Sequence, residues 1–415
     1  MVSVNLKLQK KYFLIALDQA TVALTGICTT VLITQAFGLD GLGLYVLAYS
    51  MLLLCNMVHS AFVSMPISTR LTRQAPAIDT VDDDSYYAMS HLVVVTGVFL
   101  VSILAYFVAG WMQILAEIHD FFAKVMLCIP CLLTFNYLRA IFLSDFDYGS
   151  VVRMDLSFSA LAISLLWVGG ADDVGDVFIL LSISWIIGCF VGKHFWQKFK
   201  LSPTGVKSVT VSVWLEGKWL LGYKAIAFVK TNIVIFILTW ASGPSSVGLL
   251  RVIQTLFGPL NIFIASVESF GPQYGSKIYA QDGKSGVIAF LKTVFFLLFS
   301  IWGIYSITVF FTSPYLVERF FGASETDVRL LVFIQSALLF AVICNTLLPI
   351  FIRIVGNTKS LALSPLIELL VLFIPGILLV KWLAVAGALV WYLLGVALSA
   401  SIMAALYRRS LKDEN

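Results

Sequence analysis

Three basic side chains lie inside long apolar stretches of the chain. Lys224, Lys230 and Arg251 fall within runs that are long enough to cross a membrane. A Lys or Arg at the centre of a spanning helix costs roughly 2.5–3.5 kcal/mol on insertion scales, so each is expected to face water, a counter-ion or a ligand. Because Arg can grip a phosphate through two parallel hydrogen bonds and Lys acts on it as a point charge, these residues predict a site for an anion.

Polar side chains share a face with these cations. At 100° per residue, Gln254 lies on the same side of its helix as Arg251. A similar polar stripe in an earlier apolar run consists of Tyr45, Tyr49, Asn56 and His59. Together the stripes predict a water-filled cavity lined by Tyr45, Tyr49, Asn56 and His59, with Lys224, Lys230, Arg251 and Gln254 as the substrate-binding residues.

Three acidic residues are candidates to carry a coupling ion. Asp18, Glu268 and Glu368 also lie in apolar runs, nearer the ends expected in the cytoplasm. Simpler interpretations stay open. An ion pair between Asp18 and Lys224 would be purely structural, Arg251 could extend to the membrane interface, and His59 could be a hydrogen-bonded interior histidine.

The composition is that of a membrane protein. The 415-residue chain is 60% hydrophobic and 12% charged, and its mean hydropathy is +0.96. Apolar runs of ~20 residues, each long enough to cross a ~30 Å hydrocarbon core, recur throughout. Basic clusters interleaved with exposed aromatics are absent, which argues against nucleic-acid binding. No phosphate-binding glycine loop, zinc-protease motif or nucleophile elbow occurs, so we expect neither an enzyme nor a cofactor or metal.

We predict an all-α membrane protein with about twelve transmembrane helices in two six-helix bundles. The expected helices lie near 12–37, 43–65, 87–112, 121–143, 151–169, 175–195, 215–241, 246–270, 287–312, 328–350, 360–380 and 383–406. Most Lys and Arg residues of the loops fall on one side of this arrangement. By the positive-inside rule, both termini are expected in the cytoplasm, and the first helix is expected to be an uncleaved span.

The two halves of the chain echo each other. Residues 43–66 and 248–272 each open on a glycine after a turn and close on a proline, at an offset of about 206. We therefore expect an N-terminal bundle at 1–200, a cytoplasmic linker at 201–214 and a C-terminal bundle at 215–415. Both bundles would start in the cytoplasm, which makes the repeat parallel. Duplicated bundles of this kind are typical of transporters whose site lies between the repeats.

Two segments resemble a known family. LDQATVALTGICTTVLITQAFGLDGLGLYVLA at 17–48 and SSVGLLRVIQTLFGP at 245–259 are similar to polysaccharide-export flippases. These belong to the multidrug/oligosaccharidyl-lipid/polysaccharide exporter superfamily, and the nearest members are the O-antigen (Wzx-type) translocases. The length and the two six-helix halves fit as well, so the resemblance covers nearly the whole chain and implies a MATE-like fold.

The resemblance also implies a function. Members of the family carry a cationic cavity that accepts an undecaprenyl-pyrophosphate-linked oligosaccharide, and Lys224, Lys230 and Arg251 are the residues that could do so here. The expected role is to flip an O-antigen or exopolysaccharide repeat unit across the inner membrane. Membrane lipids, a polysaccharide polymerase and a chain-length regulator are the expected partners. The alternatives are a cation-coupled drug or small-molecule exporter of the same fold and a membrane-embedded polysaccharide polymerase.

Overall fold

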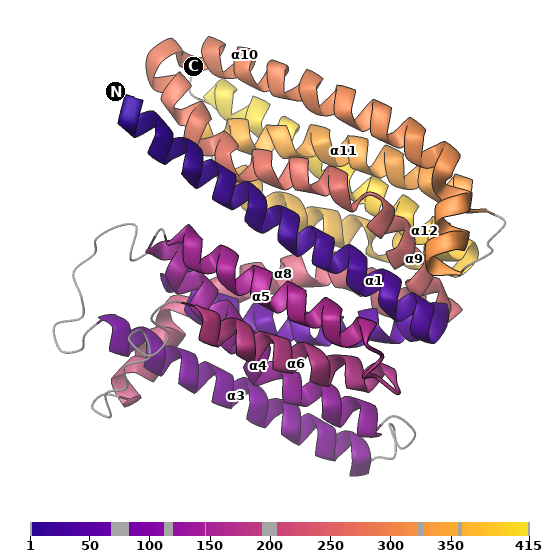
Figure 1. The fold of residues 1–415 in the computed structure, drawn as a ribbon. Helices are drawn as coiled ribbons and strands as arrows, with labels where there is room; N and C mark the ends of the chain where they lie inside the picture. The colour runs from indigo at the N-terminus through magenta and orange to yellow at the C-terminus, as the bar shows by residue number, and fades with distance from the viewer. Residues whose placement is uncertain are drawn as a thin grey trace. The chain divides into compact units, whose positions relative to one another are not determined.

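The structure, a computed structural model, describes residues 2–67, 83–111, 119–145, 147–192, 206–322, 327–355 and 359–413. Within these residues, every regular element is a helix (Figure 1). The helices are α1 (Val2–His59), η1 (Ser60–Ser64), α3 (Asp83–Trp111), α4 (His119–Ser144), α5 (Tyr148–Trp167), α6 (Val174–Val191), α8 (Val206–Ser242), α9 (Pro244–Leu256), α10 (Gly258–Phe321), α11 (Val328–Val355) and α12 (Lys359–Asp413).

The helices of the described residues can be divided into about twelve membrane segments, the number predicted from the sequence. Ten candidate spans are present when the bent pair formed by α9 and the start of α10 counts as one. Three of the ten, at 17–67, 274–321 and 364–405, contain 51, 48 and 42 residues. At 1.5 Å per residue these would be about 77, 72 and 63 Å long, roughly twice a hydrocarbon core. Each contains a non-helical residue, respectively Gly38, Gly283 and Ala384. Gly38 and Ala384 each divide one span into two, whereas the residues before Gly283 continue the bent pair of α9 and α10, so the ten spans become twelve segments.

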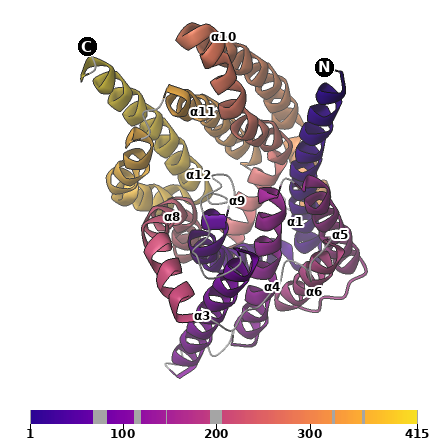
Figure 2. The same cartoon turned by 90° about the vertical axis from the view of Figure 1, so that its left-hand side faces the viewer.

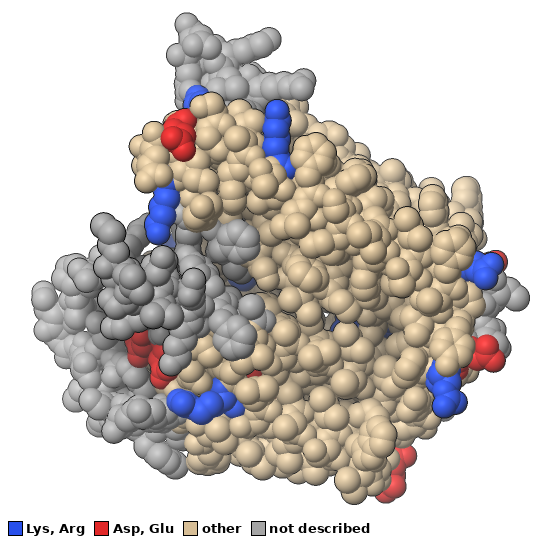
Figure 3. All heavy atoms as spheres, turned by 45° about the horizontal axis from the view of Figure 1, so that its top comes forward, with Lys and Arg blue, Asp and Glu red and all other residues tan. Residues whose placement is uncertain are grey.

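Apolar side chains cover the outside of several helices. Leu104 and Phe107 of α3 are 64% and 65% exposed, and Ile304 and Phe311 of α10 are 72% and 69% exposed. The members of the first pair are three residues apart and those of the second are seven apart, so each pair lies on one side of its helix. Uncharged residues also dominate the described surface in Figure 3, where Lys, Arg, Asp and Glu occur only as scattered groups. Such stripes are expected where lipid chains cover the protein.

The chain forms two compact units. Unit 1 contains residues 1–32 and 45–228, and α4 is its central helix, in contact with α3, α5, α6 and η1. Figure 1 shows α4, α5 and α6 side by side. Unit 2 contains residues 33–44 and 229–415. Its α11 packs against both α10 and α12 and lies between them in Figure 2, while α9 contacts all three.

The first part of α8 differs from the predicted linker at 201–214. Residues 201–205 lie outside the described residues, but α8 already begins at Val206. Trp214 stacks on Phe62 with ring centroids 6.0 Å apart, and this contact anchors the start of the helix within unit 1. The bundle boundaries at 1–200 and 215–415 stay a prediction from the sequence.

Candidate functional site

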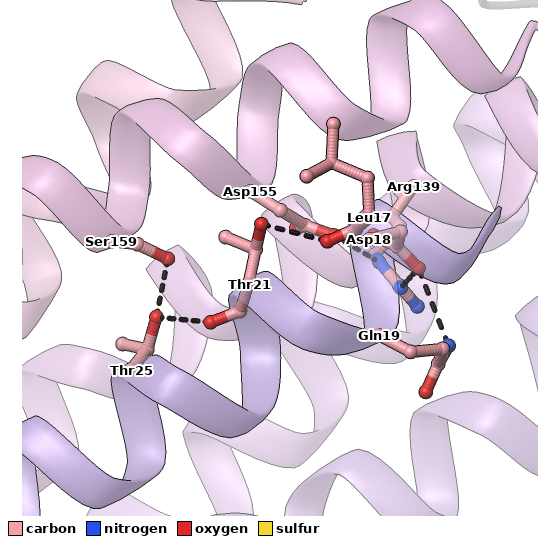
Figure 4. A network of polar contacts seen from close by, with 8 residues as sticks. All are labelled: Leu17, Asp18, Gln19, Thr21, Thr25, Arg139, Asp155 and Ser159. Carbon is pink, nitrogen blue, oxygen red and sulfur yellow. Dashed lines mark hydrogen bonds and ion pairs between the residues drawn. The ribbon is translucent and has the colours of Figure 1, made fainter. Parts of the chain in front are cut away.

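A buried group of charges links three helices of unit 1 (Figure 4). The Arg139 guanidinium on α4 donates from Nη2 to Asp18 Oδ2 of α1 at 2.6 Å and from Nε to Asp155 Oδ2 of α5 at 3.1 Å. The side chains of Asp18 and Asp155 are only 7% and 3% exposed. Two buried carboxylates therefore share one cation.

Hydroxyl groups next to this cluster hold α1 against α5. Thr25 Oγ1 donates to Ser159 Oγ at 2.5 Å, and Thr25 lies seven residues after Asp18 on the same helix (Figure 4). Thr21 donates back to the Leu17 carbonyl at 2.8 Å. Because these bonds fix both helices, the two carboxylates are held in place by more than their shared guanidinium.

The charge count of the cluster leaves room for a cation. With both carboxylates ionised, Asp18, Asp155 and Arg139 sum to one negative charge. Asp18 Oδ1 is buried and has no hydrogen-bond donor within the described residues. A proton or a small cation would balance this excess. The alternative pairing of Asp18 with Lys224 is not observed, because Arg139 occupies that role.

His59 is part of a second buried cluster in unit 1. It is fully buried, and its Nε2 lies 2.9 Å from His91 Nδ1 on α3. His91 Nε2 in turn lies 3.3 Å from Thr134 Oγ1 of α4, and the Tyr137 ring stacks on His91 at 4.3 Å. Packing among α3, α4 and the π-helix η1 thus makes His59 an interior residue here, whereas the sequence placed it on a cavity wall.

The other residues of the predicted stripe are half-buried. Tyr45 stacks between Tyr49 and Phe178, with centroid distances of 5.8 and 5.3 Å. Asn56 accepts a hydrogen bond from Asn136 Nδ2 at 3.0 Å. These contacts tie the second half of α1 to α4 and α6 within unit 1, and they leave part of each side chain accessible.

Lys230 forms an ion pair within unit 2. Its Nζ lies 2.5 Å from Glu368 Oε2 of α12, and the two side chains are 27% and 6% exposed. Gly395 allows this approach, because a Cβ atom there would lie only 2.5 Å from Glu368 Oε1. Of the three surroundings expected for Lys230, which were water, a counter-ion or a ligand, the structure shows a counter-ion, and its role in substrate binding stays a prediction.

Glu268 has a different setting from the other two acidic candidates. It is exposed on α10 and accepts a hydrogen bond from Thr346 Oγ1 of α11 at 3.1 Å. It therefore keeps access to a mobile ion, whereas Asp18 and Glu368 are buried beside a cation.

Arg251 and Gln254 lie half-buried on α9 of unit 2. Within the described residues, no carboxylate lies within ion-pair distance of the Arg251 guanidinium. The same is true of Lys224, which is half-buried on the unit 1 part of α8. Of the three predicted cations, Lys224 and Arg251 thus have no carboxylate partner in the part of the chain that the structure describes.

A break in the helix follows Arg251 closely. α9 and the start of α10 are bent by 65° at Phe257. Pro259 has no N–H to donate to the preceding turn, which favours the break. The Tyr305 hydroxyl compensates by donating to the Leu256 carbonyl at 2.7 Å. The bend makes α9 a short helix of 13 residues that carries the Arg251 guanidinium.

Sequence reasoning missed several members of the buried clusters. Arg139 and Asp155 lie near the ends of their apolar runs and were not among the candidate site residues. His91 and Asn136 were not singled out. Charged residues beside apolar segments could have been flagged as possible interior residues. Nothing in the sequence, however, showed that Arg139 and Asp155 would form a cluster with Asp18.

Neither a protein-family model nor a curated protein matches the sequence. Solved structures, in contrast, match nearly its whole length. The lipid II flippase MurJ in an inward closed conformation has a TM-score of 0.71 at 13% identity, over 93% of this chain and 85% of that one. An outward-facing multidrug resistance MATE family transporter of the MOP superfamily has a TM-score of 0.66 at 10% identity, over 97% and 94%.

A MOP superfamily transporter from Pyrococcus furiosus, whose binding pocket is described as having reverse polarity, has a TM-score of 0.65 at 11% identity, over 97% of this chain and 94% of that one. The chain has the MATE-like membrane fold. This confirms the predicted fold class of a multi-pass, all-α membrane protein. At such identities the likeness shows the fold alone, so the MATE-like fold leaves the cargo to be argued from the residues.

Proposed function

We propose that this protein is a flippase for a lipid-pyrophosphate-linked oligosaccharide, a repeat unit of an O-antigen or exopolysaccharide. The observation that carries the proposal is Arg251, a half-buried guanidinium without a carboxylate partner among the described residues. The cargo would move from the cytoplasmic to the periplasmic leaflet of the inner membrane, with both termini of the protein in the cytoplasm.

The three predicted cations differ in whether a carboxylate lies within ion-pair distance. Lys230 is paired with Glu368, whereas Lys224 and Arg251 have no such partner within the described residues. An uncompensated cation in a membrane-spanning segment is stable only when water or a ligand solvates it. A pyrophosphate is a fitting ligand, because its oxygens accept the paired hydrogen bonds of a guanidinium. Gln254, one helical turn from Arg251, adds a neutral donor suited to a sugar or phosphate oxygen.

The acidic residues supply a place for a coupling ion. Asp18 and Asp155 share Arg139 and carry one negative charge in excess. A proton or cation bound there would change the charge that holds α1, α4 and α5 together. Ion binding in unit 1 would thereby be linked to the packing of α1. Glu268, which is exposed, is a second candidate for the same role.

The proposed cargo is compatible with the fold, since one of the structural neighbours is named as a lipid II flippase. For this chain, the prenyl tail would remain in the bilayer while the pyrophosphate and sugars cross through the polar interior. Rocking of one six-helix half against the other would expose the cargo to each side in turn.

The proposal is tested by replacing Arg251 in a strain that lacks the native copy. Arg251→Ala should abolish surface polysaccharide while the protein still reaches the membrane, and Arg251→Lys should retain part of the activity. Removing one partner of a desolvated charge pair costs about 2 kcal/mol or more, which is roughly a 30-fold loss of affinity. Lys124→Ala is the matched control, because this cation is already paired with Asp120, Asp173 and Asp176.

A direct assay follows the lipid itself. Purified protein in liposomes should move undecaprenyl-pyrophosphate-linked saccharide between leaflets, and Arg251→Ala should not. Wild-type flipping by Arg251→Ala would refute the assignment of the anion to this residue. A deletion strain with normal surface polysaccharide would refute the cargo.

A second candidate function is a cation-coupled exporter of small molecules. The buried carboxylates Asp18 and Asp155 favour it, because acidic groups in a membrane interior suit organic cations. This function predicts that deletion raises sensitivity to cationic drugs and that Asp155→Asn has the same effect. Unchanged drug sensitivity together with lost polysaccharide would exclude it.

A further inference from the structure

The ion pair of Lys230 and Glu368 in unit 2 is buried unevenly. The Glu368 side chain is 6% exposed, whereas the Lys230 side chain is 27% exposed. The carboxylate is therefore the enclosed partner and the ammonium the accessible one. A Lys ammonium has three N–H donors, and the contact with Glu368 Oε2 accounts for one of them. The accessible side of the pair can thus still donate to a second anion.

The surroundings of Glu368 leave its carboxylate little room. A Cβ atom on Gly395 would lie 2.5 Å from Glu368 Oε1, so the second half of α12 closes directly on the carboxylate. The Ser364 and Ser399 hydroxyls lie 2.8 Å apart, and both residues are buried. Ser364 is four residues before Glu368, and Ser399 is four residues after Gly395. This bond joins the two halves of α12 about one helical turn from the carboxylate and holds it in place.

Helices α8 and α12 are also joined beside the pair by a bond without charge. The Tyr392 hydroxyl donates to the Thr231 carbonyl at 2.8 Å, and Thr231 follows Lys230 directly. A buried ion pair adds little net stability, because the desolvation of two charges offsets their attraction. The contact between the two helices thus does not depend on the pair alone, and the pair is free to serve in binding.

Glu368 competes with every other anion for the Lys230 ammonium. Because it belongs to the same chain, its effective concentration at Lys230 is high. Displacing it leaves a buried carboxylate without a cation, and this cost is the same whichever anion arrives.

A phosphodiester headgroup carries one negative charge, as the carboxylate does, so it only restores the lost attraction and cannot cover that cost. A lipid pyrophosphate carries a charge on each of two phosphates. Its extra oxygens accept from the donors of Lys230 that Glu368 leaves open.

We propose that Glu368 is a specificity-determining residue, an internal competitor that keeps singly charged phosphodiester lipids away from Lys230 and is displaced only by a pyrophosphate. The inference rests on the proposed function, because the lipid pyrophosphate is the cargo proposed above. Anionic phospholipids surround a protein in the bilayer and bind to basic pockets between its helices. A cation that binds a lipid cargo therefore needs protection from them, and Glu368 supplies it by occupying Lys230 until the cargo arrives.

Competition between two lipids for the purified full-length chain tests this role. Native mass spectrometry follows the binding of undecaprenyl pyrophosphate while phosphatidylglycerol, a singly charged phosphodiester, is added in increasing amounts. For wild type, phosphatidylglycerol should be a poor competitor with a high inhibition constant. In Glu368→Gln, that inhibition constant should fall about ten-fold or more, because the ammonium has lost the charge that competes with the phosphodiester.

Three further variants separate this role from a structural one. Lys230→Met/Glu368→Gln should return the inhibition constant to the wild-type value, because no ammonium is left for phosphatidylglycerol to bind. Tyr392→Phe is the matched control. It removes a bond between the same two helices but leaves both charges, so the inhibition constant should not change. Should Glu368→Gln fail to fold, Gly395→Ala gives a second measurement. Its methyl group displaces the carboxylate and should lower the inhibition constant in the same way.

The outcomes distinguish the role of Glu368 from the cargo. An inhibition constant that is the same in wild type and in folded Glu368→Gln or Gly395→Ala overturns the competitor, even where deletion of the protein abolishes surface polysaccharide. A double variant as sensitive to phosphatidylglycerol as Glu368→Gln also overturns it, because the lipid then binds away from Lys230. The expected fall in Glu368→Gln, found in a protein whose deletion leaves surface polysaccharide normal, supports the competitor and overturns the cargo.

Discussion

Removing the guanidinium from the buried cluster of unit 1 should strongly destabilise the protein. Arg139 balances Asp18 and Asp155, whose side chains are almost fully buried. In Arg139→Met, two carboxylates would face each other without a cation. Breaking a buried ion pair by removing one partner costs about 3–5 kcal/mol. For a unit of 150–250 residues, 1 kcal/mol lowers the melting temperature by roughly 2–4 °C, so the expected loss is about 6–20 °C.

The assay is thermal unfolding of purified protein in one detergent, followed by the loss of the monodisperse peak on size exclusion. Arg139→Lys should fall between wild type and Arg139→Met, because Lys keeps the charge but cannot bond both carboxylates through a planar fork. The neutral triple variant Asp18→Asn/Arg139→Met/Asp155→Asn should recover most of the loss, since it no longer buries an unbalanced charge.

The control is a cation of similar pairing at an exposed site. Lys124 bonds Asp173 at 2.7 Å and Asp176 at 2.9 Å, and the Asp173 side chain is 55% exposed. Lys124→Met should therefore change the melting temperature much less than Arg139→Met. An Arg139→Met protein that melts within 2 °C of wild type, or a triple variant no more stable than Arg139→Met, would refute the assignment of the cluster as a buried ionic network held together by Arg139.

Three further changes test other parts of the structure by the same thermal assay. Glu368→Ala should destabilise more than the double variant Lys230→Ala/Glu368→Ala, because the single change leaves the ammonium without its carboxylate; equal losses would show that the pair contributes nothing. Gly38→Ala should lose roughly 1–3 kcal/mol through backbone strain alone, because a Cβ atom there meets nothing within 4 Å, whereas Gly97→Ala within α3 should be neutral or stabilising. Ala384→Gly should gain stability of roughly 1 kcal/mol or more, because Ala384 adopts φ 46° and ψ −121°, and an unchanged melting temperature would argue against strain at this turn.

The course of the membrane helices could be predicted because hydropathy acts locally. The twelve segments follow from apolar runs, and the turns at Gly38 and Gly243 follow from glycines that interrupt them. The break between α9 and α10 was not predicted, although Gly258 and Pro259 stand at it. The break lies inside one uninterrupted apolar run, and proline alone does not predict a break, because membrane helices tolerate it when neighbouring groups bond the unpaired backbone carbonyls. Here the Tyr305 hydroxyl bonds the Leu256 carbonyl.

The partners of the charged residues could not be predicted. Their position inside apolar runs identified Lys230 and Glu368 as interior charges, but hydropathy carries no information on which residues of distant helices meet. Hydropathy likewise could not show that Asp18 pairs with Arg139. A Lys or Arg close to a helix end satisfies the positive-inside rule whether it faces the cytoplasm or turns inward to a carboxylate. Only the packing of the helices decides whether such a residue faces the cytoplasm or pairs with a buried carboxylate.

The helix α8 has a mechanical consequence. Its 37 residues form one rod of about 55 Å, of which residues 206–228 belong to unit 1 and residues 229–242 to unit 2. A slack tether would let each unit reorient without loading the other. A continuous helix instead resists twisting and bending near residue 228. Under the proposed function, the stiffness of α8 would therefore decide how much of a rearrangement caused by ion binding in unit 1 reaches Lys230, two residues further along.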